Sequence, residues 1–172
     1  MTGADNVRRP ARILLTAVAL GLGVTLPTHA DPLAAGVAAH GRGDYVTAAR
    51  LLTPLAQHGY PRAQTMLGFM YESGQGVPQD YDAAAYWYRQ SAERGDATAQ
   101  SLLGLLYDKG HGVPLDDVAA YKWLNLAAAN APKREQEYYL HLRDAVASKM
   151  NNAQIAEGQS RALEWSQRHR GF

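Results

Sequence analysis

Apolar side chains recur at spacings of three and four residues in two neighbouring segments, before and after a loop at residues 74–78. Such spacing is typical of amphipathic helices that bury one face. The loop reads Gly-Gln-Gly-Val-Pro, which ends a helix because glycine accepts left-handed backbone angles and the residue before proline is held extended. Asp80 then stands where a side chain can cap the next helix. The pattern predicts two helices joined by this loop, with inward-facing positions at Leu67, Met70 and Tyr71, then at Ala84, Tyr88, Ser91 and Ala92.

The same pattern returns 36 positions later, within the range of helical-pair repeats. The shared residues include Ala63 and Ala99, Gln64 and Gln100, Tyr71 and Tyr107, Asp80 and Asp116, Trp87 and Trp123, and the two Gly-Val-Pro loops. Gly68 and Gly104 lie inside the predicted first helices, where glycine costs about 1 kcal/mol relative to alanine. We therefore expect a neighbouring helix to approach closely at both glycines.

The repeated unit, LGxMYxxGxGVPQDYxxAxxWYRxSAxxG, resembles the Sel-one-like repeat (SLR), a close relative of the tetratricopeptide repeat. The resemblance implies an all-α fold, a right-handed solenoid of antiparallel helix pairs, whose members mostly act as adaptors for other proteins. Some exported relatives carry a disulfide in each repeat, whereas this chain has no cysteine. Its stability must then come from the stacking of the repeats.

The predicted solenoid has about three repeats and a capping pair of helices at its C-terminal end. Residues 31–59 read as a degenerate first repeat with a short loop, and residues 60–95 and 96–131 as two full repeats. No Gly-Val-Pro loop follows in residues 132–172, where two further apolar stripes predict closing helices over residues 132–149 and 153–169. The stripes consist of Tyr139, Leu142, Val146 and Met150, then Ile155, Ala162, Leu163 and Trp165.

Residues 1–30 have the order of a secretory signal: three arginines, an apolar run over residues 13–26 and a small residue, Ala30, at the exit. The run is shorter than the ~20 residues of a membrane-spanning helix. We therefore expect cleavage after Ala30 and a periplasmic or secreted protein. The alternative is an uncleaved anchor, because Thr28 stands at the third-last position of the signal.

The charge balance argues against two classes of partner. The chain has 17 basic and 16 acidic residues, and the signal would remove three arginines and Asp5, which leaves 14 and 15. Nucleic-acid grooves need clustered lysine and arginine, and electrostatic membrane binding needs a basic segment. The sequence predicts neither kind of partner.

The histidines, serines and glycine loops match no common catalytic motif. The six histidines are not spaced for a zinc-binding helix, and no serine stands three residues before a lysine, as in penicillin-recognising enzymes. The glycine loops lack the lysine of a phosphate-binding loop. The sequence therefore predicts no catalytic residue, no metal site and no cofactor. The alternative, a cell-wall-related or β-lactam-binding or hydrolysing enzyme, comes from activities assigned to some exported SLR relatives.

Binding of a protein or peptide is the preferred function, for a chain that we expect to be monomeric. The resemblance implies that the first helix of each unit lines a concave face, with the residue after the helical glycine pointing into the groove. The matching residues are Val37, Phe69 and Leu105 in a row, Thr65 and Ser101 on one side, His40, Glu72 and Asp108 on the other, and Arg62 and Thr98 at the rim. Apolar anchors between polar flanks suit an extended peptide or a helix. The alternative is that the row packs between helices, as predicted for the core rings Tyr86, Trp87, Tyr88 and Trp123.

Overall fold

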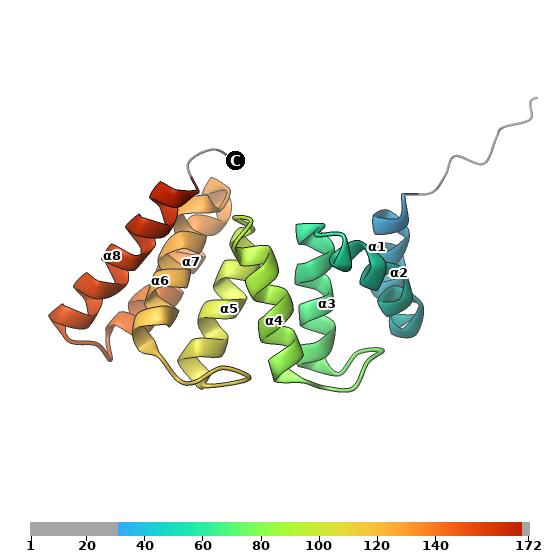
Figure 1. Ribbon diagram of the computed structural model, residues 1–172, viewed down its shortest axis with the longest axis horizontal. Helices are drawn as coiled ribbons and strands as arrows, with labels where there is room; N and C mark the ends of the chain where they lie inside the picture. The colour runs from blue at the N-terminus through green and yellow to red at the C-terminus, as the bar shows by residue number, and fades with distance from the viewer. Residues whose placement is uncertain (1–30, 170–172) are drawn as a thin grey trace, which may run out of the picture.

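The computed structural model describes residues 31–169, and the signal predicted for residues 1–30 lies outside this range. Within the described range the chain forms eight helices in an elongated row of helix pairs, with the N-terminal helices at one end and the C-terminal helices at the other (Figure 1). They are α1 (Pro32–Gly41), α2 (Tyr45–Gln57), α3 (Pro61–Ser73), α4 (Tyr81–Ala92), α5 (Ala97–Lys109), α6 (Asp117–Asn130), α7 (Lys133–Ala147) and α8 (Asn152–Arg168). The predicted all-α solenoid of helix pairs is confirmed, with the pairs α1–α2, α3–α4 and α5–α6 following one another along the chain.

Aspartates begin the second helix of each pair, as the sequence predicted for Asp80 and its repeat Asp116. Asp44, Asp80 and Asp116 each accept a hydrogen bond from the backbone N–H three residues later, at 3.2, 3.0 and 2.9 Å. Each bond satisfies one of the amide donors that a helix start leaves unpaired. Three caps at equal spacing therefore fix the starts of α2, α4 and α6 independently of one another.

The two helices of each pair touch at the helical glycine. A Cβ atom built on Gly68 would lie 2.6 Å from the Tyr88 ring, and one built on Gly104 would lie 2.9 Å from Leu124 Cγ. Both distances are too short for a side chain, so the backbones of α3 and α5 approach their partner helices closely. The close approach that the sequence predicted at these two positions is confirmed.

Each Gly-Val-Pro loop connects the two helices of one repeat and also packs against the preceding repeat. Gly76 has a φ of 73°, and a Cβ atom on it would lie 2.3 Å from the carbonyl oxygen of Tyr45, the first residue of α2. Gly112 repeats the contact with the carbonyl oxygen of Tyr81, at 2.0 Å, at the start of α4. Each loop therefore packs against the preceding repeat, and its second glycine is required both for the backbone angle and for the space.

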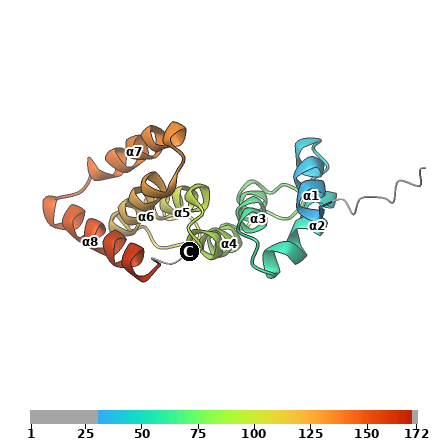
Figure 2. The same ribbon diagram turned by 90° about the horizontal axis from the view of Figure 1, so that it is seen from above.

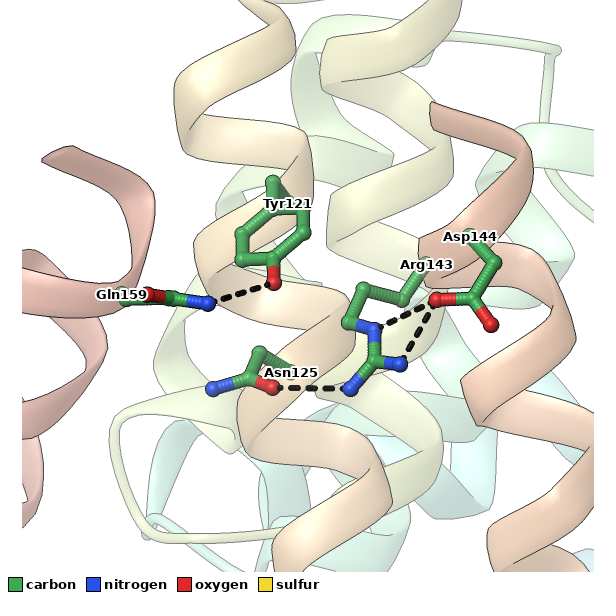
Figure 3. A network of polar contacts seen from close by, with 5 residues as sticks. All are labelled: Tyr121, Asn125, Arg143, Asp144 and Gln159. Atoms are coloured by element: carbon green, nitrogen blue, oxygen red, sulfur yellow. Dashed lines mark hydrogen bonds and ion pairs between the residues drawn. The ribbon is translucent and has the colours of Figure 1, made fainter. Parts of the chain in front are cut away.

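The two closing helices pack on α6 from two sides and form no comparable interface with each other. On one side, Arg143 of α7 donates a hydrogen bond to Asn125 at 3.4 Å and pairs with Asp144 at 2.6 Å (Figure 3). On the other, Gln159 of α8 donates to the Tyr121 hydroxyl at 3.3 Å. In Figure 2, α7 and α8 accordingly lie on opposite sides of α6.

Two of the four rings predicted for the core are fully buried, and two are not. Tyr88 is 0% exposed and Trp123 is 4% exposed, as predicted. Trp87 is only partly buried, and Tyr86 is 54% exposed, so the prediction for Tyr86 is wrong. Tyr86 lies two positions from the buried Tyr88, about 200° around the helix. The same geometry explains Leu163, which is 54% exposed because it lies two positions from the buried Trp165.

Candidate functional site

A pocket of about 270 Å³ opens where three helices, α1, α3 and α5, present side chains to one another. Its lining is almost entirely apolar in character and consists of His40, Thr65, Met66, Phe69, Thr98 and Leu102. Four of these six, all except Met66 and Leu102, belong to the groove that the sequence predicted. Seen from above, α1 and α7 project to the same side of the row, at its two ends (Figure 2).

Phe69 and His40 form the aromatic part of this pocket. Phe69 is 41% exposed, which excludes its burial between helices, and its ring centroid lies 6.0 Å from that of His40. The His40 ring also meets Tyr45 edge-on at 5.2 Å, and its Nε2 atom lies 3.1 Å from the Gln75 side-chain oxygen. Gln75 belongs to the loop after α3, so these contacts fix the α1 wall of the pocket to the next repeat.

Thr65 provides a polar wall whose hydrogen bonds are internal. Its hydroxyl lies 2.8 Å from the Ser91 hydroxyl and 3.1 Å from the Pro61 carbonyl oxygen. Asp96, the residue that caps α5, lies 3.2 Å away. Thr65 therefore ties α3 to α4 and to the start of α5, and it contributes a fixed surface to the pocket.

The remaining residues predicted for the groove lie outside the pocket. Ser101 is 4% exposed and donates to the Thr98 carbonyl oxygen, so the expectation that it flanks an open groove is wrong. The Ser101 side chain is therefore buried, and its hydroxyl is satisfied by a carbonyl oxygen of the same helix, α5. Val37 and Leu105 are partly buried, whereas Arg62 is exposed at the start of α3.

The acidic residues of the predicted groove are engaged within the chain. Glu72 accepts a hydrogen bond from the Tyr88 hydroxyl at 2.7 Å, and burial together with this bond raises the pKa of Tyr88 above its ordinary value. Asp108 forms an ion pair with Lys149, which also lies 3.4 Å from Asp117. The hydrogen bond to Asp108 raises the pKa of Lys149. Lys149 lies in the turn between α7 and α8, so this turn contacts the C-terminal end of α5 at Asp108.

Met66 and Leu102 are pocket residues that the sequence reasoning missed. They stand 36 positions apart, and each lies three residues before a residue of the predicted apolar row, Phe69 or Leu105. Residues three apart share one face of a helix. That spacing was a signal in the sequence that could have placed both in the pocket.

The arrangement can bind an apolar group, and it contains few side chains that could take part in catalysis or hold a metal ion. Among residues 31–169, no group of three or more histidines, cysteines, aspartates or glutamates is placed to hold a metal ion. No helix in this range has the length and apolar character needed to cross a membrane. The pocket itself holds one titratable side chain, His40, and two hydroxyls.

Similarities to known proteins agree with the repeat geometry. Residues 61–96 and 97–131 each match the Sel1 repeat family, whose repeats commonly mediate contacts between proteins. No curated protein sequence matches the chain.

Solved structures that are similar to the chain include two proteins with this kind of repeat. One is c5321, a protective antigen present in uropathogenic Escherichia coli strains that displays an SLR fold, with 26% identity over 79% of this chain and a TM-score of 0.74. The chain spans 29% of the length of that antigen. The other is a Sel1 repeat protein from Oxalobacter formigenes, with 35% identity over 50% of this chain and 66% of that one, and a TM-score of 0.49. Residues 61–131 therefore contain two Sel1 repeats, and the helix pairs of the chain have the SLR fold that the antigen displays.

Proposed function

We propose that this chain is an exported, non-catalytic adaptor that binds a protein or peptide partner through the pocket between α1, α3 and α5. The observation that carries the proposal is the exposure of Phe69, 41%, at the edge of an otherwise apolar pocket. A large ring held open to solvent beside other apolar side chains is typical of an interaction surface.

The pocket favours one apolar anchor of the partner. His40 and Thr98 flank the apolar lining, and Thr65 presents an oxygen that is already hydrogen-bonded. A partner side chain would thus exchange water for contact with Phe69, Met66 and Leu102, while the Thr65 hydroxyl keeps its hydrogen bonds within the chain. The export part of the proposal rests on the signal-like order of residues 1–30.

A photo-crosslinker at position 69 tests the proposal. The benzoylphenylalanine variant at Phe69 is expected to capture one partner from the periplasm, and the same group at Leu163, which is 54% exposed on α8, is not. Phe69→Ala is expected to reduce capture of that partner at least tenfold while changing Tm by less than about 2 °C, because an exposed ring contributes little to the core.

The proposal is contradicted if Phe69→Ala lowers Tm as well as capture of the partner, because Phe69 would then be a core residue. Equal crosslinking from positions 69 and 163 would also contradict a specific site. Either outcome removes the pocket as the docking surface.

A further inference from the structure

The outer surface of the second full repeat is covered by the chain's own last helix. Trp165 of α8 lies edge-on against Trp123 of α6, with ring centroids 6.2 Å apart, and the two residues are 5% and 4% exposed. The Trp165 indole N–H donates to Glu93, at the end of α4, at 2.6 Å. A tryptophan from α8 thus bridges α6 and the end of α4.

Polar groups of the same repeat are also paired. The Gln100 side-chain oxygen accepts a hydrogen bond from Asn130 at 3.0 Å, and the Gln100 amide donates to the Ala92 carbonyl oxygen at 3.1 Å. His169, four residues after Trp165, stacks on its ring at 4.1 Å and lies 3.6 Å from Glu93. The contact therefore combines an inserted indole, a carboxylate acceptor and a histidine that stacks on the indole.

The first full repeat has the same residues around its tryptophan without a covering helix, whereas the position of Tyr121 is occupied by Ala85, which is already buried. Moving back 36 positions replaces Trp123, Gly95 and Gln100 by the identical residues Trp87, Gly59 and Gln64. A pocket of about 250 Å³ lies here, and all its lining residues fall between residues 56 and 94, so α8 takes no part in it. Trp87 is partly exposed, and its neighbour Tyr86 is 54% exposed with its ring 4.9 Å from that of Trp87.

One buried polar atom in this wall lacks the partner that its counterpart has. The Gln64 amide donates to the Ala56 carbonyl oxygen at 3.0 Å, as the Gln100 amide donates to the Ala92 carbonyl oxygen. The side-chain oxygen of Gln64, however, has no hydrogen-bond partner among the described residues. The residue at the Asn130 position is Arg94, which donates instead to the Gln90 carbonyl oxygen at 2.9 Å. Gln64 is 2% exposed, so its unpaired oxygen is enclosed in the protein.

We propose that this pocket between α2 and α4 is a second binding site, which takes a helix of a partner protein carrying a tryptophan. The end of this helix that carries the tryptophan would lie on α4 as the corresponding end of α8 lies on α6, with its indole against Trp87 and Tyr86. Gln57 stands at the position of Glu93 and is the acceptor for the indole N–H.

Charge completes the description of the partner. His58 and Arg94 line the first pocket, and the carboxylate that faces His169 in the second repeat is replaced here by the neutral Gln57. His169 and Asn130 line one pocket in the second repeat, and Arg94 stands at the Asn130 position in the first. The residue four positions after the partner's tryptophan is therefore acidic, where α8 has a histidine, because it would lie near Arg94. The partner motif is Trp-x-x-x-Glu or Trp-x-x-x-Asp on a helix.

A peptide with the sequence of α8 tests the site in the full chain. The probe spans residues 152–169 with the final histidine replaced by glutamate, and titration calorimetry measures its affinity. We expect saturable binding that weakens at least tenfold when the probe's tryptophan is changed to alanine, and severalfold when its final glutamate is returned to histidine. The variants Tyr86→Ala and Gln57→Ala are expected to weaken binding of the probe, since both side chains lie on the surface.

Matched controls separate this site from the others. Lys122→Ala, at the position equivalent to Tyr86 in the covered repeat, and Phe69→Ala, in the pocket of the proposed function, should leave the probe's affinity unchanged. The proposal is overturned by absence of saturable binding up to millimolar probe, or by binding that Tyr86→Ala does not weaken. It is also overturned if sedimentation equilibrium shows a dimer that Tyr86→Ala dissociates, because the occupant would then be a second copy of the chain.

Discussion

Replacing Gly68 by alanine tests how tightly the helix pair α3–α4 is packed. The added methyl group would lie 2.6 and 2.7 Å from two carbons of the Tyr88 ring and 3.3 Å from the Ala84 carbonyl oxygen. The ring has little room to move, because Tyr88 is 0% exposed and its hydroxyl is held by Glu72 at 2.7 Å. The helices must therefore separate or the ring must leave its rotamer.

Two opposing free energies set the size of the effect. Overpacking a buried contact costs about 1–3 kcal/mol, whereas alanine in a helix gains up to about 1 kcal/mol over glycine. We expect the overpacking to win, with a net loss of about 1–2 kcal/mol in the free energy of unfolding. For a domain of this size the loss corresponds to a fall in Tm of roughly 3–7 °C.

Gly41→Ala is the matched control, because Gly41 also lies in a helix and a Cβ atom there would meet nothing within 4 Å. This variant should be as stable as the parent, or more stable by up to about 0.5 kcal/mol. Urea denaturation followed by circular dichroism gives the free energy for each protein. The reasoning is refuted if Gly68→Ala is as stable as the parent, or if the two variants shift the midpoint in the same direction.

Three further predictions follow from the buried polar groups and from the pocket. Because the pKa of Tyr88 is raised above its ordinary value of 10.0, the unfolded chain loses this proton first, and the native state loses up to about 1.4 kcal/mol per pH unit above pH 10. Tyr88→Phe should remove that slope in urea titrations between pH 9 and 11. Arg94→Asn should raise the free energy of unfolding by about 1 kcal/mol, because the new side chain gives the Gln64 oxygen a donor. Asn130→Ala should lower it by about 1–3 kcal/mol, because the Gln100 oxygen is left unpaired. Urea midpoints measure both changes. The full chain should not hydrolyse nitrocefin above the buffer rate, and turnover abolished by a single change in the pocket would contradict a non-catalytic adaptor.

The helix pairs were predictable because their determinants are local. A cap such as Asp80 acts on the amide group three residues later, and a loop glycine acts through its own backbone angle. Gly68 was predictable for a different reason, since a residue that weakens a helix in every repeat needs a compensating contact. What these signals omit is the contact between repeats, such as the docking of Gly76 on Tyr45, because the two residues belong to different units.

The positions of the closing helices could not be predicted in the same way. The apolar stripes of α7 and α8 indicate that each helix buries a face, but periodicity carries no information on which neighbour covers it. In the structure both cover α6, and Gly158 of α8 permits this because a Cβ atom there would lie 2.8 Å from the Tyr121 ring. The pocket was predicted in part, since the resemblance placed Phe69 on the exposed side of α3, whereas Thr65 and Ser101, which stand at equivalent positions, are both buried rather than exposed beside an open groove.

The differences between the two full repeats therefore support the proposal of a binding site on the first one. Gln64 and Gln100 are identical residues with the same buried amide bond, and a repeat pattern alone assigns them the same surroundings. Their side-chain oxygens differ only because Arg94 replaces Asn130, and the tryptophans beside them differ only because α8 reaches one and not the other. Where a solenoid repeats its residues but not their partners, the incomplete copy is the place to look for an outside ligand, and the first full repeat of this chain is such a copy.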